Sequence, residues 1–325
     1  MIKEYLKLSR SFNVGLTALA PVLGAFCNGE RNLIYLFLFF LVGFFGHCYG
    51  FALNDIVDYR VDALSDELKE RPLVSGKIKI RDAWIFTLLM LFISLSLGFF
   101  ISYLYSNFYA FSILVFSAIS ITVYDFISKK YPAMDIFVAL GIFLLILYGA
   151  FAVNKDINEI TWITSALGTI QVLFMQFIAG GLKDAEHDYK AKAKTLAIKL
   201  GVRVEKKIFI PLSFKFLAYS LQFIYLFFIF YPFYKIFEHG LIQIIILSIL
   251  SILMLYISHK LLSIKKFVRD EVRKYIGMHY YINFSLVPIM LTAINPFIFF
   301  LAFIPPLAFI ISNIAIHKQI LPKTM

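Results

Sequence analysis

The chain has 325 residues, of which 61% are hydrophobic, 18% are aromatic and 16% are charged. Soluble domains carry about 25% charged residues and about 45–50% apolar ones, so the composition excludes an ordinary soluble domain. The mean hydropathy of +0.82 covers the whole chain, so the apolar excess is not a single anchor segment. The aromatic content, with ordinary numbers of glycine and proline, also excludes disordered and fibrous chains. The composition therefore indicates a polytopic membrane protein.

The first ten residues carry Lys3, Lys7 and Arg10 and lead into an apolar run, as the start of a signal peptide would. No small-residue cleavage site follows, so we expect a retained first membrane helix. The two cysteines, Cys27 and Cys48, both lie in apolar stretches. They are too few for a disulfide framework or a cysteine metal site, and we expect them to be buried as small apolar side chains.

Membrane-spanning helices need about 20 mostly apolar residues, and ten runs of this kind follow one another along the chain. They are 12–27, 33–53, 83–104, 107–124, 134–153, 161–182, 208–231, 240–258, 275–294 and 296–316. The last two are separated only by Asn295 and Pro296, and a proline disfavours helix at the residue before it. We therefore predict an all-α bundle of nine transmembrane helices, or ten if 296–316 crosses separately. The bundle forms one domain over 1–325, with its core at 5–295.

The basic residues are distributed very unevenly between the predicted loops. With the N-terminus inside, 27 of the 31 lysines and arginines lie in cytoplasmic segments, whereas Arg31, Lys155 and Lys235 lie outside and Lys215 lies within a helix. Cytoplasmic loops collect positive charge, so this split predicts the orientation. The net charge of +11 then reflects attraction to anionic lipid or to an anionic substrate, and nucleic acid is not needed to explain it.

A first acidic cluster follows the second predicted helix, on the cytoplasmic side. Asn54, Asp58 and Asp62 succeed one another at intervals of four residues, and Asp55 lies three residues before Asp58. On a helix, these four side chains project to one side. Carboxylates at this spacing repel one another and destabilise the helix. The arrangement therefore predicts a bound cation.

A second cluster follows the sixth predicted helix and contains Asp184 and Asp188, again four residues apart. Oxygen ligands without a matching set of histidines or cysteines favour Mg²⁺. This ion takes one or two protein carboxylates and completes its shell with water and phosphate oxygens, so two such clusters facing each other would hold a diphosphate. Nearby basic side chains would neutralise the remaining phosphate charge, namely those of Arg60, Arg71, Lys129, Lys130, Lys183 and Lys190.

An alternative is that the acids only balance neighbouring lysines on a solvated surface. We favour this interpretation for Asp66, Glu67, Glu70 and Glu186, which stand outside the regular spacing. The spaced residues recur in two clusters at the same level of the membrane, which favours a binding site for them.

The spaced motifs and the segments around them resemble those of the UbiA-type intramembrane prenyltransferases. The matching segments are 9–13, 54–62, 71–78, Tyr124 with Lys129 or Lys130, 184–188, 194–197 and 200–201. Their order along the helices agrees with that of the family, so the resemblance spans residues 5–295. It implies a helix bundle around a central cavity that opens to the bilayer and binds an isoprenyl diphosphate with Mg²⁺ as cofactor.

The same resemblance implies roles for individual residues. The implied metal ligands are Asn54, Asp58, Asp62, Asp184 and Asp188. The implied catalytic carboxylates are Asp55, Asp58, Asp62, Asp184 and Asp188, among which Asp55 and Asp62 support the site. The implied diphosphate-binding residues are Arg60, Arg71, Tyr124, Lys129, Lys130 and Lys183. The implied acceptor-binding residues are Arg10, Asn13 and His47, although His47 also fits a buried histidine with satisfied hydrogen bonds.

These features predict a transferase that moves an isoprenyl chain from an allylic diphosphate to an acceptor in the cell membrane, with its active site on the cytoplasmic side. Metal ions and cations would stabilise the leaving diphosphate, and apolar walls would keep water from the allylic cation. The acceptor stays open between an aromatic, quinone-type ring and a lipid. Eight residues separate Asp62 from Arg71, which resembles the aromatic-acceptor members more than the ether-lipid members of the digeranylgeranylglyceryl phosphate synthase type.

Two other classes of protein fit the sequence less well. A transporter would place its ionisable residues near the middle of the membrane, whereas these acids cluster at one face. A CDP-alcohol phosphotransferase also uses aspartates and Mg²⁺, but its motif requires a glycine where Tyr59 stands. Both alternatives therefore rank below prenyl transfer.

Overall fold

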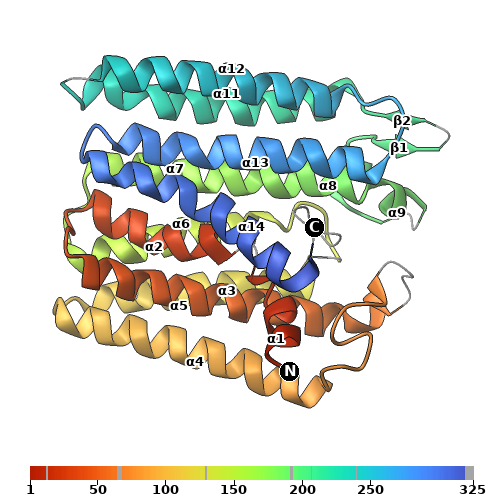
Figure 1. Ribbon diagram of the computed structural model, residues 1–325, viewed down its shortest axis with the longest axis horizontal. Coiled ribbons are helices and arrows are strands. Elements are labelled where there is room, and N and C mark those ends of the chain that lie inside the picture. Colours follow the sequence, from red (N-terminus) through yellow and green to blue (C-terminus); the bar gives the residue numbers. More distant parts are fainter. Residues whose placement is uncertain are drawn as a thin grey trace. The chain divides into compact units, whose positions relative to one another are not determined.

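The computed structural model describes residues 1–11, 14–63, 68–128, 130–190, 193–205, 207–238 and 240–318. Apart from one short hairpin, the regular structure in these residues is helical, which confirms the predicted all-α class (Figure 1). The chain divides into two compact units. Unit 1 comprises Met1–Phe126, Leu140–Ser165 and Pro305–Met325, and unit 2 comprises Ile127–Ala139 and Ala166–Ile304. The single domain over 1–325 stays a prediction.

Unit 1 is built from long apolar helices. Its elements are α1 (Ile2–Leu8), α2 (Val14–Cys27), α3 (Leu33–Asp62), α4 (Ile80–Leu104), α5 (Phe108–Ile127), most of α6 (Ile136–Val153), the start of α7 (Glu159–Leu173) and α14 (Ile304–His317). Both cysteines are buried and unpaired, as expected.

Apart from the short stretch Ile127–Ala139, unit 2 begins within α7, shortly before the helix changes its winding. Its further elements are the π-helical segment η3 (Phe174–Gly180), α8 (Gly181–Lys183), α9 (Ala185–Lys190), α10 (Leu196–Lys199), the hairpin strands β1 (Arg203–Val204) and β2 (Ile208–Phe209), α11 (Leu212–Lys235), α12 (Leu241–Leu262), α13 (Arg269–Leu291) and the 3-10 helix η4 (Pro296–Phe303). The two strands pair antiparallel, with Val204 opposite Ile208.

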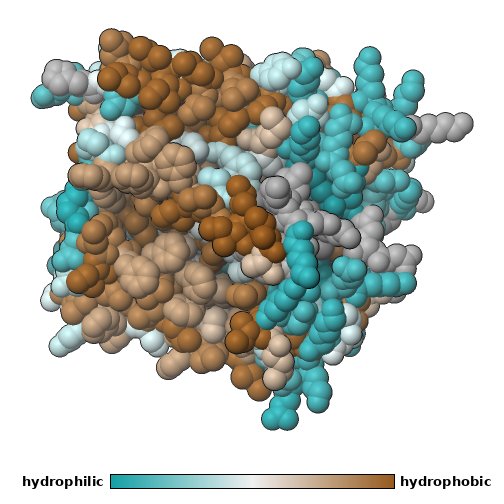
Figure 2. All heavy atoms as spheres, viewed as in Figure 1, coloured by the Kyte–Doolittle hydropathy of each residue, from teal (hydrophilic) through white to brown (hydrophobic). Residues whose placement is uncertain are grey.

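Seven helices in the described residues are long and apolar enough to cross a membrane. The other apolar segments, Val14–Cys27 and Pro296–Ala308, are shorter. Each of the ten apolar runs overlaps a helix, but the number of crossings stays a prediction. Figure 2 shows apolar side chains along α4 in unit 1 and along α11 and α12 in unit 2, and hydrophilic ones at the ends that carry α1 in unit 1 and the β-hairpin in unit 2. These surfaces make the chain an integral membrane protein.

Two small apolar cores fix the ends of the helices that carry the acidic motifs. In unit 1, Ala52 and Ile56 of α3 pack in one buried cluster with Leu8, Leu73 and Ile78, which joins α1 and the loop before α4 to the end of α3. In unit 2, Leu182 and Ala185 are 1% and 0% exposed and belong to a cluster that includes residues of η3, α11 and α13. The backbone on either side of Asp184 is therefore anchored.

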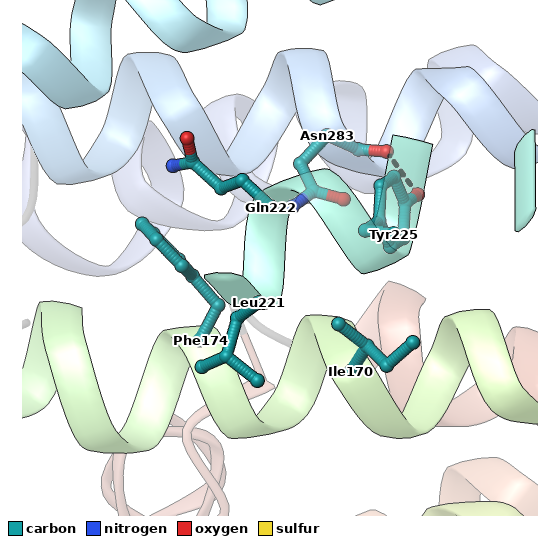
Figure 3. Close-up of a pocket in the computed structure, with 6 residues that line it drawn as sticks. All are labelled: Ile170, Phe174, Leu221, Gln222, Tyr225 and Asn283. Atoms are coloured by element: carbon teal, nitrogen blue, oxygen red, sulfur yellow. Dashed lines mark hydrogen bonds between the residues drawn. The ribbon is translucent and has the colours of Figure 1, made fainter. Parts of the chain in front are cut away.

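A buried polar group lies beside η3, deep in unit 2. Gln222 of α11 contacts Ser258 of α12 and the Nε2 atom of His279 of α13, at 3.2 Å for the second pair. The ring of His279 stacks on Phe174, the first residue of η3, with centroids 4.2 Å apart. Figure 3 shows the side chains that pack next to this group, namely those of Ile170, Phe174, Leu221, Gln222, Tyr225 and Asn283. The start of the π-helix is thus held by fully buried contacts.

Helices α2 and α6 approach each other at two glycines. A methyl group on Gly149 would lie 2.0 Å from the carbonyl oxygen of Pro21, and one on Gly24 would lie 1.8 Å from that of Ile146. These separations are too short for any carbon–oxygen contact, so the backbones would have to move apart. Small residues allow such close helix packing in membranes.

We predict that Gly149→Ala lowers the free energy of unfolding by about 1–3 kcal/mol, the usual cost of overpacking a filled interface. Gly46→Ala is the matched control in the same unit, because the nearest atom to its methyl group would be the Ser94 Oγ at 3.5 Å. Thermal unfolding in detergent measures both. Equal unfolding temperatures for the two variants would contradict the close approach of α2 and α6.

Candidate active site

The first acidic motif lies on the last two turns of α3, so the helical spacing predicted from the sequence is confirmed. Asp55, Asp58 and Asp62 are 4%, 9% and 6% exposed, and Asn54 is half-buried. The packing of Ala52 and Ile56 turns one face of α3 into the protein and fixes the direction of the polar residues between them. Three carboxylates therefore lie at the end of a long, largely apolar helix with little access to water.

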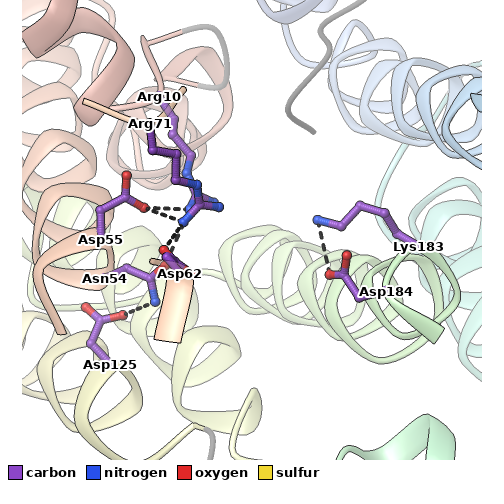
Figure 4. Close-up of polar contacts among 8 residues, drawn as sticks. All are labelled: Arg10, Asn54, Asp55, Asp62, Arg71, Asp125, Lys183 and Asp184. Carbon is purple, nitrogen blue, oxygen red and sulfur yellow. Dashed lines mark hydrogen bonds and ion pairs between the residues drawn. The ribbon is translucent and has the colours of Figure 1, made fainter. Parts of the chain in front are cut away.

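Two arginines from distant segments neutralise this motif, as Figure 4 shows. Arg71 contacts Asp62 and also donates to the Asp55 Oδ1 at 3.3 Å. Arg10 donates to the same Asp55 oxygen at 2.8 Å, and its contact with the Asn54 Oδ1 is longer, at 3.5 Å. Burying carboxylates without such partners would cost several kcal/mol for each charge. Arg71, predicted to bind diphosphate, and Arg10, predicted to bind the acceptor, thus both contact the motif itself.

Arg10 is held in place by several groups besides its ion pair. Its backbone has a φ of 45°, in the left-handed region, and its carbonyl oxygen lies 3.3 Å from the Nε2 of His47. The guanidinium carbon lies 5.0 Å from the centre of the Phe51 ring. The other ring nitrogen of His47 contacts the Thr17 hydroxyl at 3.0 Å. The structure therefore places His47, 2% exposed, as a support for the Arg10 backbone.

Asp125 of α5 belongs to the same cluster and was not among the predicted residues. The Asn54 Nδ2 donates to the Asp125 Oδ1 at 3.2 Å, and the Asp125 side chain is buried. A carboxylate inside an apolar helix end was the signal that could have identified it, because such residues mark functional sites in membrane proteins. Tyr124, which was predicted to bind diphosphate, directly precedes Asp125 in the chain and is half-buried.

The other predicted basic residues are less confined. Arg60 of unit 1 and Lys130 of unit 2 are exposed, whereas Lys183 is half-buried and contacts the Asp184 Oδ2 at 3.5 Å. Two predicted residues, Asn13 and Lys129, lie outside the described residues.

The second acidic motif lies at the break between α8 and α9. The Asp188 backbone N–H donates to the Asp184 carbonyl at 2.9 Å, so both residues share one turn, as predicted. Burial and the neighbouring charge of Asp184 raise the pKa of Asp188. The pair therefore favours a bound cation, since a positive charge would relieve both effects.

Arg269, at the start of α13, is a further residue that the sequence did not single out. Its Nη2 donates to the Asp184 Oδ1 at 3.0 Å across 85 positions of the chain. The sequence shows only that the segment around the start of α13 is rich in lysine and arginine, which does not distinguish Arg269 from its neighbours. The contact itself depends on how α13 packs against α8.

The described residues contain no group of three or more histidine, cysteine or acidic side chains that could hold a metal ion by themselves. This donor set fits Mg²⁺, which takes one or two carboxylates at a time and completes its shell with water and substrate phosphate. Asn54 and Asp58 on α3, and Asp184 and Asp188 at the α8–α9 break, are the oxygen donors that could bind it.

Long apolar helices define the chain as an integral membrane protein, and its two carboxylate motifs lie at helix ends. Residues 16–287 match the model of the UbiA prenyltransferase family. The chain belongs to this family, which confirms the resemblance seen in the sequence, and it is therefore a prenyltransferase.

Several relatives are archaeal. The chain is 29% identical over 222 residues to a digeranylgeranylglyceryl phosphate synthase of Methanococcus vannielii, covering 68% of this chain and 75% of that one. It is 30% identical over 210 residues to the protein of that name from Thermococcus gammatolerans, covering 62% and 71%.

Two solved structures share the fold. One, described as digeranylgeranylglyceryl phosphate synthase in membranes, has 26% identity and a TM-score of 0.62, covering 94% of this chain and 98% of that one. The other is a UbiA homologue of Archaeoglobus fulgidus bound to GPP and Mg²⁺, with 23% identity and a TM-score of 0.64, covering 90% and 99%.

We predict that Arg71→Met lowers the free energy of unfolding by about 2–3 kcal/mol, because it leaves the carboxylates of Asp55 and Asp62 less compensated. Removing one partner of a fully buried ion pair costs roughly 3–5 kcal/mol. We expect a smaller loss here, because the Arg71 side chain is 21% exposed. Adding Asp62→Asn to Arg71→Met should cost less than the sum of the single changes, by about 1 kcal/mol or more.

The control is Lys190→Met, which breaks an exposed pair with Glu186 and should change stability by less than about 0.5 kcal/mol. All variants are compared by thermal unfolding in detergent. Strictly additive effects of Arg71→Met and Asp62→Asn would show that the two side chains are not coupled.

Proposed function

We propose that this prenyltransferase moves an allylic isoprenyl chain from its diphosphate to the hydroxyl group of a glycerophosphate-type lipid, with Mg²⁺ as cofactor. The observation that carries the proposal is the pair of aspartate motifs, each held by arginine at the end of membrane helices. The archaeal relatives, digeranylgeranylglyceryl phosphate synthases, support the ether-lipid alternative for the acceptor over an aromatic ring. The Archaeoglobus structure with GPP and Mg²⁺ supports the donor and the metal.

In this mechanism, Asn54 and Asp58 would hold Mg²⁺ at the first motif, and Asp184 and Asp188 would hold it at the second. The metal would withdraw charge from the leaving diphosphate. Arg71 and Arg10 hold Asp55 and Asp62 in place, and so fix the α3 turn that bears the metal ligands. The bond between the allylic carbon and the diphosphate oxygen breaks. A bond from that carbon to the acceptor oxygen forms, and the acceptor hydroxyl gives its proton to the released diphosphate.

The test offers the purified protein a set of prenyl diphosphates with Mg²⁺ and two classes of acceptor, a prenylated glycerophosphate and 4-hydroxybenzoate. We expect mass spectrometry to detect a product that carries a second ether-linked prenyl chain, and no aromatic product. Prenylation of the aromatic acceptor alone would reject the lipid acceptor.

Asp58→Ala and Asp184→Ala should each abolish product formation without loss of the folded protein, because these side chains are proposed to bind metal and are not part of an apolar core. Glu186→Ala is the matched control in the second motif, since Glu186 forms an exposed ion pair with Lys190 and is not proposed to bind metal. Near-normal turnover by both aspartate variants would remove the metal assignment.

We propose further that both motifs open to the cytoplasm. The excess of lysine and arginine in the loops on that side of the predicted topology supports this orientation. Cysteines substituted for the exposed Lys77 and Lys194 should react with a membrane-impermeant thiol reagent only in inside-out vesicles. A cysteine substituted for the exposed Lys155 is the control and should react only in right-side-out vesicles. The native Cys27 and Cys48 are each 4% exposed and give little background. Reaction of either of the first two variants in right-side-out vesicles would reverse the orientation.

A further inference from the structure

The start of α13 carries two arginines beside its acids. Asp270 and Glu271 lie in the first turn, where they suit the helix dipole, and Arg269 and Arg273 lie next to them on the same helix. Their side chains are only 26% and 18% exposed, whereas that of Asp270 is 93% exposed. The arginines are therefore turned towards the protein and the acid towards solvent. The two acids already suit the helix dipole, so the dipole does not explain why the arginines face the protein.

The partner of Arg269 is the first carboxylate of the second motif. Each Asp184 oxygen contacts one cation, Oδ1 the Nη2 of Arg269 at 3.0 Å and Oδ2 the Nζ of Lys183 at 3.5 Å. Asp184 ends α8 with φ −101° and ψ 5°, outside regular helix. Its side chain is thus directed by the two basic groups as well as by the backbone.

A role in stabilising the fold does not account for the ion pair between Arg269 and Asp184. The apolar cluster that contains Leu182, Ala185, Val272 and Ile276 already joins α8 and α9 to α13. The Asp184 side chain is 40% exposed, and ion pairs with such exposure contribute about 0–1 kcal/mol to stability. The ion pair therefore adds little stability to the packing of α8 and α9 against α13, which the apolar cluster already provides.

We infer that Arg269, together with Lys183, binds a phosphate group of the substrate beside Asp184. This inference rests on the proposed function, because it assigns the phosphate to a substrate of prenyl transfer. A guanidinium has five N–H donors in a planar fork that matches phosphate oxygens, so it can contact Asp184 and a phosphate together. Arg269 holds Asp184 in place before the metal binds and then neutralises phosphate charge next to it.

The test compares Arg269→Gln and Arg269→Lys with Lys274→Gln, an exposed lysine on the same helix, as control. The first readout is the dissociation constant of inorganic diphosphate with Mg²⁺, measured without turnover. We expect Arg269→Gln to raise it about tenfold or more, since a hydrogen bond to a charged group contributes that much. Arg269→Lys keeps the positive charge but lacks the planar fork of donors. Its dissociation constant for diphosphate should lie between those of Arg269→Gln and the wild type.

Two sources of the phosphate are separated by KM values in the transfer reaction. A rise confined to the KM of the prenyl diphosphate, with weaker diphosphate binding, assigns the phosphate to the donor. A rise confined to the KM of the phosphorylated acceptor, with weaker binding of glycerol 3-phosphate, assigns it to the acceptor. Either result supports the inference.

Binding and KM values within about twofold of those of Lys274→Gln would overturn the inference, as would a loss of binding matched by a lower unfolding temperature. The binding measurement does not depend on the acceptor. A protein that shows no lipid prenylation but binds Mg²⁺–diphosphate through Arg269 would refute the proposed function and leave the phosphate contact standing.

Discussion

The charge balance of buried carboxylates is the constraint on which the two acidic motifs depend. Asp55 and Asp62 are almost fully removed from water, at a position where the chain leaves the apolar part of α3. Ionised groups are retained in such a place only if cations of fixed geometry accompany them. Arg10 and Arg71 supply these cations from the segment before α2 and from the loop before α4. Both segments thus provide the positive charge that the end of α3 requires.

The apolar contacts make this charge balance possible. Leu8 precedes Arg10 by two residues, and Leu73 follows Arg71 by two, and both leucines are buried in one cluster with α3. The backbone of each arginine is therefore fixed beside the carboxylate that it contacts. His47 adds a polar support by lying next to the Arg10 carbonyl. Hydrophobic packing fixes the backbone positions of the two arginines, and the ion pairs with Asp55 and Asp62 depend on those positions.

The sequence was sufficient to predict the helices and the helical spacing of the motifs, because both depend on local periodicity. The apolar runs correspond to helices, and residues 54–62 lie on one of them. The contacts of Asn54 with Asp125 and of Asp184 with Arg269 could not be predicted, since 71 and 85 positions separate the partners. Such pairs are fixed by tertiary packing, and no local pattern distinguishes Arg269 from the other basic residues near the start of α13.

The π-helical segment η3 was also beyond local prediction, although it bears directly on the second motif. Helices α7, η3 and α8 continue one another up to Lys183, so the wider winding of η3 changes the direction in which the residues after it project. Phe174, the first residue of η3, is 2% exposed and is held against His279 in the buried polar group. π-helical turns are rare and concentrate at functional sites. This one is followed by α8 and then by Asp184, so we connect it with the position of that carboxylate. The direction of a proposed metal ligand is therefore set by packing that begins at Phe174, well before the motif itself.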